Sequence, residues 1–128
     1  MAITICPKFW HLPDSLEWEI LTAVVGGKET AGKYLKAVSG WKEYKKFKGS
    51  KSYEIKSGNG EDKYGFSALP GGYGYSYDDI GSSGIWWSAS EYNSEGAYIW
   101  EIDSSGEYVS WIYGIKNFLH SVRCLQDR

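Results

Sequence analysis

The fold of this 128-residue chain is decided by three short stretches: residues 65–73 (GFSALPGGY), 85–92 (IWWSASEY) and 121–124 (SVRC). Residues 74–84, between the first two stretches, consist almost wholly of glycine, serine, tyrosine and aspartate. This composition is typical of a rigid sheet that carries irregular, aromatic-rich loops, and such loops often form binding surfaces. We therefore expect any functional site to lie in the second half of the chain.

The first half contains the helical patterns. Asp14 is a good N-cap and Glu17, three residues later, completes a capping box, so the sequence predicts a helix that begins here and ends at Gly26-Gly27. Apolar residues recur at helical spacing and predict one buried face. The expected buried face comprises Leu16, Ile20, Leu21, Val24 and Val25.

A second, shorter helix is expected from Thr30 to about Val38, with Tyr34, Leu35 and Val38 facing the core and Trp41 filling the core after it. Residues 42–63 are polar and rich in turn residues, so we expect a long loop with one short strand around residues 53–55. The lysines between Lys42 and Lys56 are expected to be a solvated stretch; the alternative is a polyanion site.

The second half predicts strands at residues 85–88, 97–103, 108–113 and 118–125, with a hairpin turn at residues 104–106. An antiparallel sheet of this kind needs a helical layer to cover it. The fold class expected is α+β, with two helices packed on a twisted antiparallel sheet that carries long irregular loops. Length and composition favour a single domain over residues 1–128.

Charge and hydropathy exclude several classes of protein. The net charge of -2, from 14 basic and 16 acidic residues, argues against nucleic-acid binding. No run reaches the ~18 apolar residues of a membrane span, so we expect no direct membrane insertion. Residues 1–5 do not resemble a secretory signal, so the chain is either cytosolic or cut from a longer secreted parent. On spacing alone, Cys6 and Cys124 are about equally expected to form a disulfide or to be buried thiols.

Few residues suggest catalysis or metal binding. His11 and His120 lie in no catalytic motif, so each is expected to be a structural or surface histidine. The two cysteines make no zinc motif, and we expect no metal site and no cofactor. Loop oxygen donors leave a structural calcium open as a minority alternative, and strand and loop carboxylates leave glycoside hydrolysis as another. The calcium candidates are Asn59, Glu61, Asp62, Asp78, Asp79 and Asp103, and the carboxylates considered for hydrolysis are Glu91, Glu95, Glu101 and Asp103.

Aromatic residues are the strongest functional signal. Seven tryptophans and eleven tyrosines exceed what one small core normally absorbs, and alternation in the predicted hairpin places large rings on both faces. We expect one face to be core and the other to be a partly exposed contact face between residues 100 and 117. The ligand-binding residues predicted are Trp100, Tyr108, Trp111, Tyr113 and Asn117.

Together the motifs resemble those of the Fibrobacter succinogenes major paralogous domain, a large family of bacterial surface and secreted proteins. The resemblance begins at residues 6–13 (CPKFWHLP), includes the three stretches quoted first, and leaves out residues 42–62. It implies a C-type lectin-like fold, similar to formylglycine-generating enzymes and to the hypervariable receptors of diversity-generating retroelements. It also implies that Cys6 and Cys124 are paired, with the termini side by side, and that the chain is part of a longer exported protein at or beyond the cell surface.

The chain departs from these relatives where chemistry is concerned. The Glu-Pro-Asn and Trp-Asn-Asp motifs of calcium-dependent lectins are missing, and the extra cysteines of the formylglycine enzymes have no counterparts. We therefore expect a non-enzymatic binding module, with carbohydrate preferred over protein as the ligand. The alternatives are a retroelement receptor that binds protein, an enzyme, and a structural spacer. The receptor's varied positions would be Trp111, Tyr113, Ile115, Asn117, Phe118, Leu119 and His120.

Overall fold

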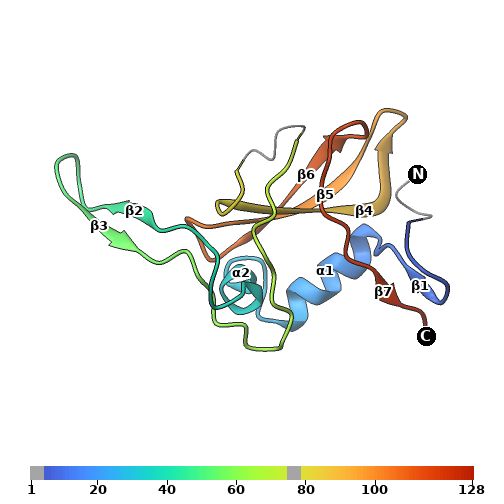
Figure 1. The fold of residues 1–128 in the computed structure, drawn as a ribbon, viewed down its shortest axis with the longest axis horizontal. Coiled ribbons are helices and arrows are strands. Elements are labelled where there is room, and N and C mark those ends of the chain that lie inside the picture. The colour runs from blue at the N-terminus through green and yellow to red at the C-terminus, as the bar shows by residue number, and fades with distance from the viewer. Residues whose placement is uncertain (1–4, 75–78) are drawn as a thin grey trace.

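The computed structural model of the chain describes residues 5–74 and 79–128. Helices α1 (Ser15–Val24) and α2 (Ala31–Leu35) precede a three-stranded antiparallel sheet of order β4-β5-β6 (Figure 1). Its strands are β4 (Ser83–Asn93), β5 (Gly96–Asp103) and β6 (Val109–Ile115). The expected α+β class, with two helices and antiparallel strands, is confirmed.

Helix α1 begins as predicted. The Asp14 side chain accepts a hydrogen bond from the Glu17 amide at 2.8 Å, and the Glu17 carboxylate accepts one from the Asp14 amide at 3.1 Å. Gly26 and Gly27 follow with φ angles of 119° and 95°, which only glycine adopts without strain, so the helix ends here.

The predicted buried face of α1 was largely wrong. Leu16, Ile20 and Val24 are exposed, whereas Trp18 and Thr22 are buried, together with Val25 just after the helix. The reason is Trp18, whose indole stacks on Trp100 of β5 with ring centroids 4.5 Å apart. Because burying an indole removes far more apolar surface from water than burying an aliphatic side chain, α1 is rotated to bring Trp18 to the sheet.

Helix α2 is shorter than predicted. Leu35 is fully buried, but Val38 lies beyond the helix and is exposed. Trp41 fills the core as expected, with its indole N–H donating to the Ala68 carbonyl at 3.0 Å.

Residues 42–63 contain a hairpin that the sequence analysis had treated as a loop with one short strand. Strands β2 (Tyr44–Phe47) and β3 (Tyr53–Lys56) pair antiparallel and project away from the helices and the main sheet (Figure 1). The polar composition concealed β2, because a hairpin exposed on both faces lacks the alternation of a half-buried strand.

Both faces of the main sheet are packed, each by a different core. Toward the helices, Trp18, Trp86, Trp100 and Ile102 form one cluster with Leu35 of α2. On the opposite face a second cluster forms around Ile85, Trp87 and Ile99, to which Leu12, Ala97 and the partly buried Cys6 and Val122 belong. The sheet therefore leaves little of its central strand β5 exposed.

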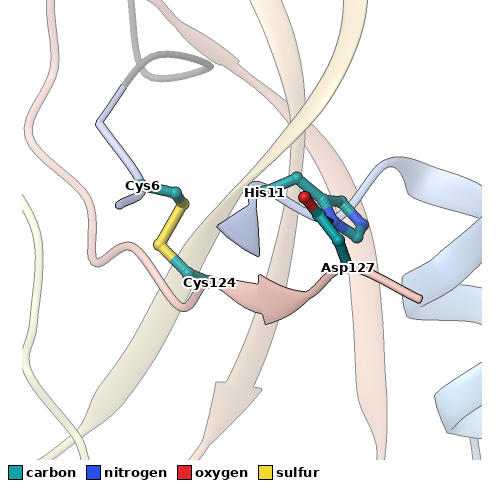
Figure 2. The surroundings of a disulfide bond; sticks show 4 residues. All are labelled: Cys6, His11, Cys124 and Asp127. Atoms are coloured by element: carbon teal, nitrogen blue, oxygen red, sulfur yellow. Dashed lines mark hydrogen bonds and ion pairs between the residues drawn. A yellow bond between two sulfur atoms is a disulfide. The ribbon is translucent and has the colours of Figure 1, made fainter. Parts of the chain in front are cut away.

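The two ends of the described chain lie side by side. Cys6 and Cys124 form a disulfide with Cα atoms 5.8 Å apart, which confirms the pairing (Figure 2). Strand β1 (Trp10–His11) pairs antiparallel with β7 (Leu125–Gln126). The predicted long last strand at 118–125 was wrong: the chain turns at Phe118, and the next segment pairs with β4 in a single bridge, in which Ser121 exchanges backbone hydrogen bonds with Ile85 and Trp87.

Candidate functional site

A hollow lies over the helix-distal face of the main sheet, near the Asp103 end of β5. It encloses about 600 Å³ and is called the sheet cavity below. Strands β4, β5 and β6 form its floor, and the segments around Tyr73 and His120 form its sides. It is lined by Tyr73, Asp79, Ser83, Ile85, Ile99, Glu101, Asp103, Ile112, Tyr113, Gly114, Ile115, Phe118 and His120.

The cavity exists because the second core covers only part of this face. Trp87 and Ile99 are buried beneath the segment that follows His120, whereas Ile112, one strand further out, is half exposed. Alternation along β5 brings Ile99, Glu101 and Asp103 to the same face, so this part of the sheet carries one apolar and two acidic side chains. The hollow is thus apolar at one end and acidic at the other.

Glu101 is the half-buried carboxyl group of the cavity. Burial raises its pKa, and the neighbouring carboxylates of Asp103 and Asp79 raise it further. A hydrogen bond from Ser83 opposes this shift by favouring the charged form. A half-buried carboxylate that is kept among other acids is well suited to accept hydrogen bonds from ligand hydroxyl or ammonium groups.

His120 forms part of the opposite side of the cavity. Its ring meets the edge of Trp87 with centroids 4.7 Å apart, and burial lowers its pKa to about 4, so it is neutral at pH 7. Neither ring nitrogen has a hydrogen-bond partner among the described residues. Gly114 gives the ring its space, since a Cβ there would lie 3.1 Å from His120 Nε2. His120 thus packs as a structural histidine, but its ring nitrogens have no hydrogen-bond partner among the described residues.

A group of three tyrosines on the other face of the sheet, the face that also carries Trp100, is called the tyrosine cluster. Tyr113 stacks on Tyr92 with ring centroids 4.3 Å apart and planes inclined by 8°. Tyr98, the ladder partner of Tyr113, meets the edge of Tyr92 at 5.6 Å. Tyr92 and Tyr113 are both about half exposed, so the cluster presents aromatic surface to solvent. Tyr113 also lines the cavity. Alternation puts its side chain on the face of Trp100 and Trp111, so the cluster and the cavity lie on opposite sides of the edge strand β6, to which Tyr113 belongs.

The predicted ligand-binding residues do not form one face. Trp100 has no exposed surface: its indole stacks on Trp18 and donates to Thr22 Oγ1 at 3.2 Å. Its assignment as a contact residue was wrong, because its side of β5 faces α1. Trp111, its ladder partner on β6, is half buried and packs against the same core.

The other three predicted residues are exposed but separated. Tyr108 precedes β6 and Asn117 follows it, so the whole strand, about 20 Å long, stands between them. Only Tyr113 is both exposed and adjacent to the cavity. The sequence analysis missed Tyr73, Tyr92 and Tyr98 as site residues, although the aromatic composition of their segments was the available signal. Glu101 was predicted only as a minor catalytic candidate, and Asp103 only as a minor candidate for catalysis or for calcium binding.

The remaining candidates for metal binding or catalysis do not come together in the described residues. Among residues 5–74 and 79–128, no group of three His, Cys, Asp or Glu side chains is arranged to hold a metal ion; Asp78, one of the calcium candidates, lies outside these residues. His11 is structural: its ring nitrogens contact Asp127 at 2.6 Å and Glu17 at 2.9 Å, and Figure 2 shows His11 and Asp127 close to the disulfide. Glu91, another carboxylate considered earlier, is ion-paired with Lys116 at 2.6 Å.

Comparisons with known proteins complete the description. No helix among the described residues has the length and apolar character needed to cross a membrane. Neither a curated protein nor a solved structure matches the chain significantly. The profile of the Fibrobacter succinogenes major domain, however, matches residues 2–126, which is nearly the whole sequence. The chain therefore belongs to the Fibrobacter succinogenes major domain family.

Proposed function

We propose that this chain is a non-enzymatic carbohydrate-binding module with a C-type lectin-like fold, carried by an exported bacterial protein. The ligand stacks on the tyrosine cluster and reaches around the edge strand β6 into the sheet cavity. The observation that carries the proposal is the position of Tyr113, which is exposed, stacks on Tyr92 and also lines a hollow that contains Glu101.

The chemistry of the two features suits a sugar. Pyranose rings have apolar C–H faces that pack on flat aromatic rings, and the nearly parallel rings of Tyr92 and Tyr113 offer such a flat surface. Sugar hydroxyl groups are hydrogen-bond donors, and the carboxylates of Glu101 and Asp103 accept such bonds. Burial strengthens these bonds, since the lower local dielectric weakens competition from water.

Export is supported by the disulfide. Cys6–Cys124 closes a loop of 118 residues, and structural disulfides persist in oxidising compartments outside the cytosol. We therefore place the module at the cell surface or in the extracellular space, as part of a longer parent protein.

The test is retention of the purified domain on a panel of soluble glycans and insoluble polysaccharides. The proposal predicts specific retention that the Tyr113→Ala variant loses and that calcium chelation leaves unchanged. Measuring release of reducing sugar in the same incubations separates binding from hydrolysis, because a glycosidase would use a carboxyl group of raised pKa, such as that of Glu101, as its general acid. Reducing-sugar release that is lost in Glu101→Gln would replace binding with catalysis.

A second candidate is a variable receptor for protein ligands. The observation that favours it is the exposed apolar surface between residues 112 and 119, where Ile112, Ile115 and Leu119 are each about half exposed. Related copies of the domain from one genome that differ only within residues 109–120 would support this candidate over carbohydrate binding.

A further inference from the structure

The projecting hairpin carries an apolar stripe on one face. Ladder pairing places Lys45 opposite Ile55 and Phe47 opposite Tyr53, so these four side chains share one face of the two strands. Phe47 is 65% exposed, Ile55 53% and Tyr53 49%. A two-stranded hairpin is marginally stable by itself, and no described element covers this face. The hairpin therefore offers large apolar side chains to a partner.

The hairpin is also strongly basic. Residues 44–56 contain five lysines and one glutamate, a net charge of +4 in a chain whose total is -2. Glu54 is ion-paired with Lys48 at 3.4 Å and with Lys56 at 3.3 Å. Lys45, Lys46 and Lys51 have no ion pair among the described residues, and the Lys45 ammonium lies 4.7 Å above the Tyr53 ring. The partner should accordingly be apolar and acidic.

The outer face of helix α1 is both apolar and acidic. Leu16, Ile20 and Val24 follow one another at a spacing of four residues, are exposed by 61%, 53% and 74%, and form a stripe on the side away from Trp18. Residues 14–25 contain three acidic residues and no basic one. Asp14 caps the helix and Glu17 is ion-paired with His11, so the carboxylate available beside the stripe is that of the exposed Glu19, one turn from Leu16. Nothing in the described part of the chain covers this stripe.

We infer that the hairpin of one copy of this chain docks on the outer face of α1 of a second copy. The apolar stripe of α1 extends about 12 Å along the helix, and four residues of strand extend about 13 Å, so the two surfaces match in length. Their charges are opposite, so docking removes both stripes from water while bringing the hairpin's lysines toward the Glu19 carboxylate. Because the two surfaces differ, every copy carries both halves of the contact.

Other occupants fit the hairpin less well. The rings of Phe47 and Tyr53 are inclined by 61°, so they do not make the flat platform on which a sugar would stack. A polyanion would pair with the lysines but would leave Phe47 and Ile55 in water. The α1 stripe, by contrast, can bury the apolar side chains of the hairpin and at the same time place an acidic side chain near its lysines.

The inference is tested by sedimentation velocity of the purified chain, measured over a range of concentrations that spans about a hundredfold. The wild-type chain should associate as its concentration rises, and added salt should weaken the association by screening the charges. Two variants each remove one half of the contact: Ile20→Lys on α1 and Phe47→Glu on the hairpin. Each alone should weaken self-association at least about tenfold. Both residues are exposed, so near-ultraviolet circular dichroism should show an unchanged fold.

Mixing the two variants is the decisive step. Ile20→Lys retains an intact hairpin and Phe47→Glu retains an intact α1, so an equimolar mixture should form complexes of one copy of each. The control is Leu69, a 61% exposed residue away from both surfaces, changed to Lys in one sample and to Glu in another; both control variants should associate as the wild type does. A wild-type chain that stays monomeric, or a mixture that fails to associate, would overturn the inference.

Discussion

Tyr113 and Tyr92 stack face to face, with ring centroids 4.3 Å apart and planes 8° from parallel, although they lie on the two outer strands of the main sheet. The stack is close to Tyr98 on the central strand between them, and Tyr113 also lines the sheet cavity on the other side of β6. An aromatic pair left half exposed adds less stability than a buried pair, and in the proposed function these two rings are the surface on which the ligand stacks.

Replacing Tyr113 with Ala should therefore weaken glycan binding about tenfold or more while changing the melting temperature little, because the side chain is 58% exposed. Tyr113→Phe keeps the ring and should keep most of the binding. The matched control is Tyr64→Ala, at a tyrosine exposed to 54% away from the cavity, which should leave binding intact. Affinity measured by isothermal titration calorimetry and melting curves together check this prediction.

Trp100→Ala should have the opposite effect on stability. The indole is fully buried, stacks on Trp18 and bonds Thr22, so its removal should cost about 3–5 kcal/mol of unfolding free energy. Urea denaturation followed by tryptophan fluorescence measures this cost. Trp111→Ala removes a half-buried ring and should lower the unfolding free energy by less. A Trp100→Ala variant as stable as the wild type would contradict the packing described here.

Glu101→Gln separates stability from function. Because the folded-state pKa of Glu101 is raised, its charged form is disfavoured in the folded protein, and stability falls as pH rises through that pKa. The glutamine variant should therefore be at least as stable as the wild type at pH 7. It should bind glycan more weakly, since a strong acceptor is lost. Binding by the wild type should also decline as pH falls toward the pKa of Glu101, and a profile without this decline would exclude its carboxylate from the site.

The ion pairs that His11 makes with Glu17 and Asp127 should make the stability of the fold depend on pH. Hydrogen bonds to Glu17 and then to Asp127 raise the folded-state pKa of His11 above 6.5, so its stabilisation is fully present below pH 6.5 and is lost as pH rises through the raised value. Although burial by itself raises the pKa of Glu17, hydrogen bonds from His11 and the Asp14 amide lower it overall, so the Glu17 part is lost as pH falls through that lowered value. His11→Gln should lower the melting temperature more at pH 6 than at pH 8.5. Equal losses at the two pH values would contradict this account.

Reducing the disulfide should be the most destabilising change outside the core. The bond closes a loop of 118 residues, and the chain-entropy model assigns about 4–5 kcal/mol to a loop of that size. Thermal melts with and without reductant measure the loss, and the Cys6→Ser, Cys124→Ser double variant should match the reduced wild type. A melting temperature insensitive to reductant would show that the termini are held by other contacts alone.

The sequence was sufficient to predict features that depend on local chemistry. The capping box of Asp14 and Glu17 and the glycine stop after α1 follow from neighbouring residues, and the structure confirms both. The disulfide followed from family resemblance. The buried face of α1 could not be predicted from spacing, because Leu16, Ile20 and Val24 make a regular stripe whose exposure depends on where Trp100 lies in the sheet.

The candidate site was predicted in part. Composition pointed to exposed aromatic rings in the second half, and Tyr113 is one of them. Alternation cannot say which face of a sheet a helix covers, so Trp100 was assigned to the wrong side. The pairing of Tyr92 with Tyr113 and the approach of His120 to Trp87 depend on contacts between distant segments, which no local pattern contains.

The most direct test of the proposed function is retention on a glycan and insoluble-polysaccharide panel, with the wild type, Tyr113→Ala and Tyr64→Ala compared in parallel. The account predicts selective retention of the wild type and of Tyr64→Ala, and loss of retention in Tyr113→Ala at an unchanged melting temperature. Retention of Tyr113→Ala equal to that of the wild type, or no retention of the wild type on any glycan, would contradict it.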